Sequence, residues 1–247
     1  MITAIQLYNH LNELIPRTLN EEWDNDGLMC AAGIGDEVKK VMVTLDVTEE
    51  AVERAVKNGI DTIISHHPLI FKPIKNIQSN KLISLIRHNI TVMSFHTRLD
   101  AIENGVNSQL ANILELDGVE VFGGLGRVGY MPREYAFYDF IQYIKNLLNS
   151  PNISAVRQKN VVRHVAVTGG DGKDYYNEAK RTGADTYLTG SMSYNTMVDA
   201  AEGGMNVIAA GHYQTENLIC KYLEQLVLKI DGGIEVEIFE SDPILYF

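Results

Sequence analysis

Apolar and polar positions along this chain follow the pattern of strands that alternate with helices. Residues 3–15 carry polar residues at helical spacing, which predicts an amphipathic helix with Thr3 as its N-cap and Pro16 as its stop. An isoleucine-rich run of a length that suits a buried strand ends in two adjacent histidines, His66 and His67. Near the end of the chain, apolar and charged residues alternate over residues 234–238, as in an edge strand with one exposed face.

Two segments of the chain repeat one pattern. Residues 41–65 align without gaps on residues 165–189 at a constant offset of 124, and seven of the 25 aligned positions are identical. Each copy has an apolar run, a turn, a helix, a glycine near the helix end (Gly59 or Gly183) and a second apolar run. Glycine suits a helix end that needs positive φ, and the second run lacks the alternation of a half-exposed strand. We therefore predict two similar α/β halves related by an internal repeat, with mainly parallel sheets flanked by helices.

The repeat resumes after loops of different length. Residues 89–100 resemble residues 205–216 at an offset of 116, and in both an apolar run ends in a histidine with an acidic residue four places later. These pairs are His96 with Asp100 and His212 with Glu216. Open α/β sheets place their sites beyond the carboxyl ends of strands. We expect domains at residues 1–125 and 126–247, with one composite metal site between them.

The adjacent histidines His66 and His67 belong to the first half only. Such a pair is, taken alone, more often structural than catalytic, because histidine has many uses besides metal binding. Consecutive strand residues point to opposite faces, so both rings can serve one site only if the chain turns there, and Pro68 favours such a turn. The alternatives at this point are satisfied polar groups at a strand end or half of a metal site.

Imidazole and carboxylate groups without a thiolate suit Zn, Mn, Fe, Co or Ni and do not choose among these metals. Five candidate ligands are too many for one catalytic zinc ion and suitable for two divalent ions. A carboxylate such as Glu216 can bridge two ions, an arrangement that acidifies a shared water and supports hydrolysis. The pattern therefore favours two divalent metal ions as cofactors.

Composition narrows the function classes. The net charge of −11 makes nucleic acid an unlikely partner, because nucleic-acid-binding proteins neutralise phosphates with clustered basic residues. The chain has no apolar run long enough to predict a membrane span and no apolar region of a signal peptide, so we expect no membrane partner. Two cysteines far apart in the sequence fit a reducing compartment, and we expect a cytoplasmic location.

Five motifs resemble those of the NGG-interacting-factor-three-like (NIF-three-like) family, also named GTP cyclohydrolase I type 2 homologues. They are SHHPLIF, HTRLD, GHYQTE, EEWDNDGL near the start and SDPILYF at the end, and the likeness covers essentially the whole chain. The resemblance implies two similar α/β domains and a ring-shaped homohexamer whose metal sites face an internal cavity. Some relatives carry an inserted domain between the halves, and at 247 residues this chain looks like the short form without it. The implied ligands of a dinuclear metal site are His66, His67, Asp100, His212 and Glu216.

The resemblance also implies a function. It suggests a dinuclear metal-dependent hydrolase, in the GTP cyclohydrolase version opening the purine ring of a small-molecule nucleotide substrate by metal-bound hydroxide. Glu216 is then the bridging ligand, and His96 lies close by as a proton shuttle. The alternative is a non-enzymatic metal-binding, metal-delivery or adaptor protein that acts as a ring-shaped oligomer.

The segment EEWDNDGL contains the only tryptophan of the chain, Trp23, followed by a turn-forming Asp-Asn-Asp-Gly. Composition alone favours a capped loop with an anchoring aromatic residue. The family resemblance implies instead that Asp24 and Asn25 lie near the metal site.

Overall fold

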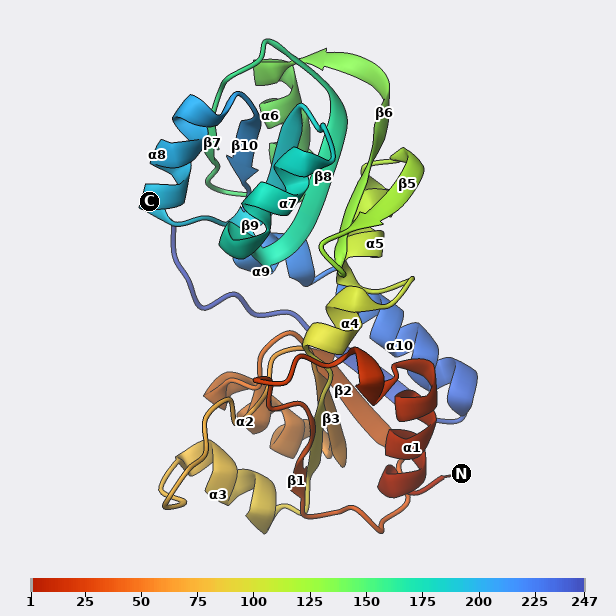
Figure 1. The fold of residues 1–247 in the computed structure, drawn as a ribbon. Coiled ribbons are helices and arrows are strands. Elements are labelled where there is room, and N and C mark those ends of the chain that lie inside the picture. Colours follow the sequence, from red (N-terminus) through yellow and green to blue (C-terminus); the bar gives the residue numbers. More distant parts are fainter. Residues whose placement is uncertain (1, 247) are drawn as a thin grey trace. The chain divides into compact units, whose positions relative to one another are not determined.

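The computed structural model describes residues 2–246, which form two compact units (Figure 1). The first unit extends to Leu99 and also takes in Ile219–Pro243, and the second holds Asp100–Leu218 with the chain from Ile244 onward. These units differ from the expected halves of 1–125 and 126–247. The expected boundary falls in the turn between strands β5 (Asp117–Phe122) and β6 (Gly126–Ala136), which pair with each other in one sheet.

The first unit contains a five-stranded sheet with the strand order β1-β4-β3-β2-β11. Strands β2, β3, β4 and β11 run parallel, and β1 is antiparallel to β4. The strands are β1 (Gly27–Ala31), β2 (Lys40–Thr44), β3 (Thr62–Ser65), β4 (Thr91–Ser94) and β11 (Glu235–Phe239). The helices are α1 (Ala4–Leu14), the 3₁₀ helix η1 (Arg17–Leu19), α2 (Glu49–Asn58), α3 (Asn80–Arg87) and α10 (Ile219–Ile230). In Figure 1, α10 lies beside α1, against which it packs although the two are distant in sequence.

Local sequence explains where the helices of the first unit begin and end. The Thr3 side chain accepts a hydrogen bond from the backbone N–H of Gln6, and the Gln6 side chain accepts one from the backbone of Thr3, so α1 starts with a complete capping box. Thr48 caps the start of α2 by accepting from the backbone N–H of Ala51, and Gly59 caps its end with a φ of 66°. The predicted N-terminal helix, the glycine stop and the C-terminal strand are thus confirmed.

The second unit contains a six-stranded sheet with the strand order β5-β6-β8-β9-β10-β7. Its remaining strands are β7 (Ser154–Val156), β8 (Val161–Asp171), β9 (Thr186–Ser191) and β10 (Asn206–Ala209). Its helices are α5 (Val106–Ile113), α6 (Phe137–Leu147), η2 (Lys173–Tyr175), α7 (Tyr176–Arg181), α8 (Tyr194–Gly203) and α9 (His212–Glu216). Strands β8, β9 and β10 are parallel, whereas β5, β6 and β7 pair antiparallel. This sheet is therefore mixed, in contrast to the expected mainly parallel arrangement, because a hairpin and a short edge strand flank its parallel centre.

The internal repeat is visible in the strand registers. Val41 on β2 pairs with Thr62 on β3, and Val165 on β8 pairs with Thr186 on β9, so the offset of 124 holds on both strands. At the next strand the register gives an offset of 115, although the histidines that follow are 116 apart. The second copy accommodates one extra residue before its histidine, where Gly211 adopts a φ of 102°. Two related α/β units are thus confirmed.

The longest helix of the structure, α10, has 12 residues. Among residues 2–246, no helix combines the length and the apolar character needed to cross a membrane.

Candidate metal centre

Three histidines of the first unit gather at the carboxyl end of its parallel strands. His66 and His67 follow β3, and His96 lies between β4 and the short helix α4 (Thr97–Ala101). The ring centroid of His66 is 5.0 Å from that of His67 and 5.4 Å from that of His96. Each of the three residues offers one ligand atom, and these atoms lie within 4.8 Å of one another. The chain turns directly after β3, where the Ser65 hydroxyl donates to the carbonyl of His67 at 2.9 Å. Both rings of the adjacent pair can therefore serve one site, as the turn at Pro68 predicts.

The Nδ1 atom of each of these histidines contacts an oxygen of the first unit. The distances are 2.9 Å from His66 to the carbonyl of Phe95, 2.8 Å from His67 to Asp46 and 2.9 Å from His96 to Asp24. A carbonyl or carboxylate oxygen accepts, so Nδ1 is the donor in each of these bonds and Nε2 is the ring nitrogen left to bind a metal. Metal-binding histidines in proteins have this arrangement, because a bond at one nitrogen fixes the tautomer and orients the other. The cluster therefore fits a divalent metal ion.

The loop that contains Trp23 fixes the position of His96. Asp24 has a fully buried side chain that bonds the His96 ring, and its Oδ2 accepts from the backbone N–H and the hydroxyl of Thr97 at 3.2 and 2.9 Å. Burial alone would raise the pKa of Asp24, but the hydrogen bond and charge of His96, together with the bonds from Thr97, lower it below its ordinary value. Asp24 thus remains ionised and holds the imidazole in one orientation. The family-based expectation that Asp24 lies near the site is met within the first unit.

The second unit brings its three predicted ligands together. His212 and Glu216 are the first and last residues of α9, and His212 Nε2 lies 3.0 Å from Glu216 Oε2. A carboxylate oxygen of Asp100, in α4, lies within 4.8 Å of a carboxylate oxygen of Glu216. Glu216 is 5% exposed and packs against Gly170, whose φ is +59° and where any side chain would collide with the carboxylate. Glu216 thus lies close to both His212 and Asp100, and imidazole nitrogens and carboxylate oxygens are donors that suit a divalent metal.

The structure adds one residue that sequence reasoning missed. Asp46 bonds His67 from the turn between β2 and α2, the first strand-to-helix turn of the repeat. The place of Asp46 in the sequence could have marked it as a site residue, because α/β sheets collect functional groups in the turns after their parallel strands. The counterpart of Asp46 in the second copy is Gly170, which makes room for Glu216. The same position thus supplies a carboxylate in one unit and space for one in the other.

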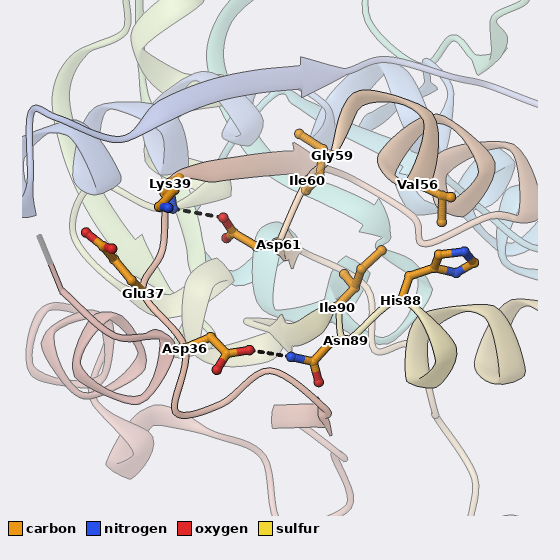
Figure 2. A pocket seen from close by; sticks show the side chains of 10 residues that line it. All are labelled: Asp36, Glu37, Lys39, Val56, Gly59, Ile60, Asp61, His88, Asn89 and Ile90. Carbon is orange, nitrogen blue, oxygen red and sulfur yellow. Dashed lines mark hydrogen bonds between the residues drawn. The ribbon is translucent and has the colours of Figure 1, made fainter.

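A separate cavity of about 560 Å³ lies at the amino ends of β2, β3 and β4 (Figure 2). His66, His67 and His96 lie beyond the opposite, carboxyl ends of these strands. The polar groups of the cavity hold the protein itself together: Asp61 Oδ2 accepts from the backbone N–H groups of Lys39 and Lys40 at 2.8 and 3.0 Å, and the Asn89 amide donates to Asp36. These bonds fix the chain where it enters the strands. The cavity therefore has a structural explanation and adds no ligand to the metal centre.

The sequence of the chain matches a known family over almost its full length. The model of the family Duf34/NIF3 (NGG1p interacting factor 3) matches residues 2–244. The chain belongs to the Duf34/NIF3 family. The resemblance drawn from the five motifs is confirmed, and the histidine and His-Glu groupings described above are potential metal-binding groups of a Duf34/NIF3 protein.

Relatives within the Duf34/NIF3 family share most of the chain. A Clostridium perfringens protein named GTP cyclohydrolase 1 type 2 homolog is 32% identical over 247 residues, covering 93% of each chain. A Streptococcus pneumoniae protein of the same name is 34% identical over 245 residues, covering 92% of this chain and 91% of that protein. The crystal structure of a Bacillus cereus protein related to NIF3 matches with a TM-score of 0.93 at 24% identity, covering 100% of this chain and 99% of that one. The last likeness concerns the fold alone.

Proposed function

We propose that this Duf34/NIF3 protein is a metal-dependent hydrolase that acts on a nucleotide, with a GTP cyclohydrolase-like ring opening as the working reaction. The observation that carries the proposal is the orientation of the adjacent pair His66 and His67, whose Nδ1 atoms are both held by oxygen acceptors. Such preorganisation is typical of metal ligands. Histidines with a purely structural role do not need to bring their ring nitrogens close together. The relatives named GTP cyclohydrolase 1 type 2 homolog support the choice of substrate class.

Two divalent ions are proposed to share five candidate ligands. Bound divalent ions lower the pKa of water and neutralise developing negative charge, which are the needs of hydrolysis near neutral pH. His96 is proposed to move protons at its Nε2 atom, because Asp24 occupies Nδ1 and fixes the ring. The ligands are His66, His67, Asp100, His212 and Glu216.

Metal content tests the ligand set before any activity is measured. The protein is loaded separately with Zn, Mn, Fe, Co and Ni, dialysed, and analysed for bound metal. We expect two ions per chain in the unmodified protein, and a loss in both a His66→Ala/His67→Ala variant and a Glu216→Ala variant, with circular dichroism unchanged. Unchanged metal content in the double histidine variant would contradict the proposal. A Glu235→Gln variant, altered at an exposed ion pair with Lys40, is the matched control for loss of a carboxylate.

Formate release from GTP tests the reaction. We expect turnover with at least one metal that disappears in Glu216→Ala. In His96→Gln, turnover should fall while the metal content stays, since His96 is assigned to proton transfer and not to the ligand set. A protein that holds two ions but releases no formate with any metal would exclude the cyclohydrolase reaction and favour metal delivery.

We propose a ring-shaped homohexamer as the assembly, on the basis of the motif resemblance. Mass photometry tests it directly, because six copies of a 27.6 kDa chain differ clearly in mass from one or two. The same measurement on the Glu216→Ala variant shows whether a change in metal content alters the assembly.

A further inference from the structure

Two exposed aromatic rings flank His96 in the first unit. Trp23 is 63% exposed and Phe71 is 49% exposed, although both are large apolar side chains. Single exposed apolar residues are common, but a paired tryptophan and phenylalanine beside a group of oriented histidines are not explained by packing. We call Trp23 and Phe71 the aromatic platform.

The protein holds the platform in place from both sides. Asn25 donates its side-chain amide to the carbonyl of Ile70 and also contacts the sulfur of Met29 at 3.9 Å. Trp23 lies two residues before Asn25, and Phe71 directly follows Ile70. The bond from Asn25 to Ile70 therefore holds the two aromatic residues in neighbouring loops. Asp24, buried against His96, anchors the same loop to the histidine cluster. The platform is therefore preorganised next to His96.

The rings of the platform are not stacked on each other. The ring centroids of Trp23 and Phe71 are 6.1 Å apart with an interplanar angle of 59°, and each lies 6.2 Å from the His96 ring at 81° and 83°. Contacts at such angles join an edge to a face, so His96 covers at most one face of the indole. The exposed fraction of Trp23 leaves room for a flat ring to stack on it.

We propose that the aromatic platform binds the flat heteroaromatic ring of the substrate, and this inference rests on the proposed function for the choice of ligand class. A ring stacked on the indole at roughly 3.5 Å would lie beside His96, the residue assigned to proton transfer. Stacking needs no cationic groups, which suits a protein with a net charge of −11. The platform thus supplies recognition of a nucleobase-like ring, while phosphate recognition is left to other groups.

A second protein copy is a poorer occupant than a small ring. A stable protein interface buries about 800 Å² on each partner, whereas a wholly buried aromatic side chain contributes only about 150–250 Å². Two rings that are already partly covered offer much less than an interface needs. One flat ligand ring matches the available area.

Trp23 is the only tryptophan, so fluorescence excited at the long-wavelength edge of the absorption band, where the 12 tyrosines absorb little, reports on the platform. The full-length protein is treated with a chelator to remove metal and titrated with guanosine and adenosine, with ribose 5-phosphate as the control that lacks a flat ring. We expect saturable quenching by the nucleosides and none by the sugar phosphate. A Phe71→Leu variant, which keeps apolar bulk without a ring, should bind roughly 10-fold more weakly, and Phe71→Tyr should bind like the unmodified protein.

Two results would overturn the inference. One is the absence of saturable quenching by either nucleoside in protein whose circular dichroism is native. The other is a fluorescence change that depends on protein concentration without ligand, which would mean that a second copy covers Trp23. Because this titration uses neither metal nor turnover, nucleoside binding without formate release would contradict the proposed reaction and leave the platform standing.

Discussion

Replacing Asp26 by Asn removes the anionic partner of a fully buried arginine. Arg98 is 0% exposed, and its guanidinium group makes an ion pair with Asp26, with 2.6 Å from Nη2 to Oδ1 and a hydrogen bond of 3.0 Å from Nε to Oδ2. Its Nη1 donates to Asn12 Oδ1 at 2.7 Å and to the carbonyl of Ile15 at 2.8 Å. Asp26 Oδ2 also accepts the backbone N–H of His96 at 2.9 Å, so the pair supports the histidine cluster.

The magnitude follows from the burial of the charge. Breaking a buried ion pair by removing one partner costs about 3–5 kcal/mol, because the other charge remains buried without compensation. The two neutral acceptors of Arg98, from Asn12 and Ile15, remain in the Asp26→Asn variant and place the expected loss at the lower end, about 3 kcal/mol. An Asp26→Asn/Arg98→Met double variant removes both charges and should be more stable than Asp26→Asn alone.

Urea unfolding followed by the fluorescence of Trp23 measures this loss, because Trp23 lies in the same unit as the pair. The control is Glu235→Gln, which breaks the exposed pair with Lys40 and should cost less than about 1 kcal/mol. A loss in Asp26→Asn no larger than in this control, or a double variant less stable than Asp26→Asn, would refute the reasoning.

Four further predictions concern other parts of the chain. Gly170→Ala should lose bound metal because its methyl group would displace the carboxylate of α9, while Gly59→Ala, also at positive φ but in open space, should only lower stability by about 1–2 kcal/mol; metal analysis and urea unfolding distinguish them. Asp46→Asn should weaken metal affinity about 10- to 100-fold in a competition titration. Burial raises the pKa of Cys220 from 9.0 to about 12, so a thiol reagent at pH 8 should modify Cys30 first. The unfolded chain releases the Cys220 proton at lower pH than the folded one, so this thiol should make stability fall as pH rises from 9 to 12 in urea unfolding.

The candidate ligands could be found from sequence because they recur at matching strand ends. The pairs His96 with Asp100 and His212 with Glu216 stand at equivalent places in the two repeats, and a strand end is recognisable from its apolar run. Asp46 and Asp26 could not be assigned in the same way. A single carboxylate in a turn has many uses, and only the fold shows that it contacts a histidine 21 residues later or an arginine 72 residues later.

The boundaries of the units could not be predicted because they depend on pairing between distant segments. Strand β11 pairs with β2 through contacts such as Val236 with Val41, although nearly 200 residues separate them. The alternating pattern of β11 predicts an edge strand, but it does not indicate which strand β11 pairs with. The antiparallel strands β5, β6 and β7 lie outside the repeated segments, so the repeat could not predict the mixed sheet either.

The return of the chain to the first unit has a consequence for protein synthesis. A ribosome makes the first unit's strands β1 to β4 early, but α10 and β11 appear only after Asp100–Leu218, the main segment of the second unit, has been translated. Until then the edge of β2 has no partner on that side, and an open strand edge invites pairing with other chains. The six-stranded sheet of the second unit can thus fold first, and the nascent first unit is the part of this protein for which we expect chaperone protection during translation.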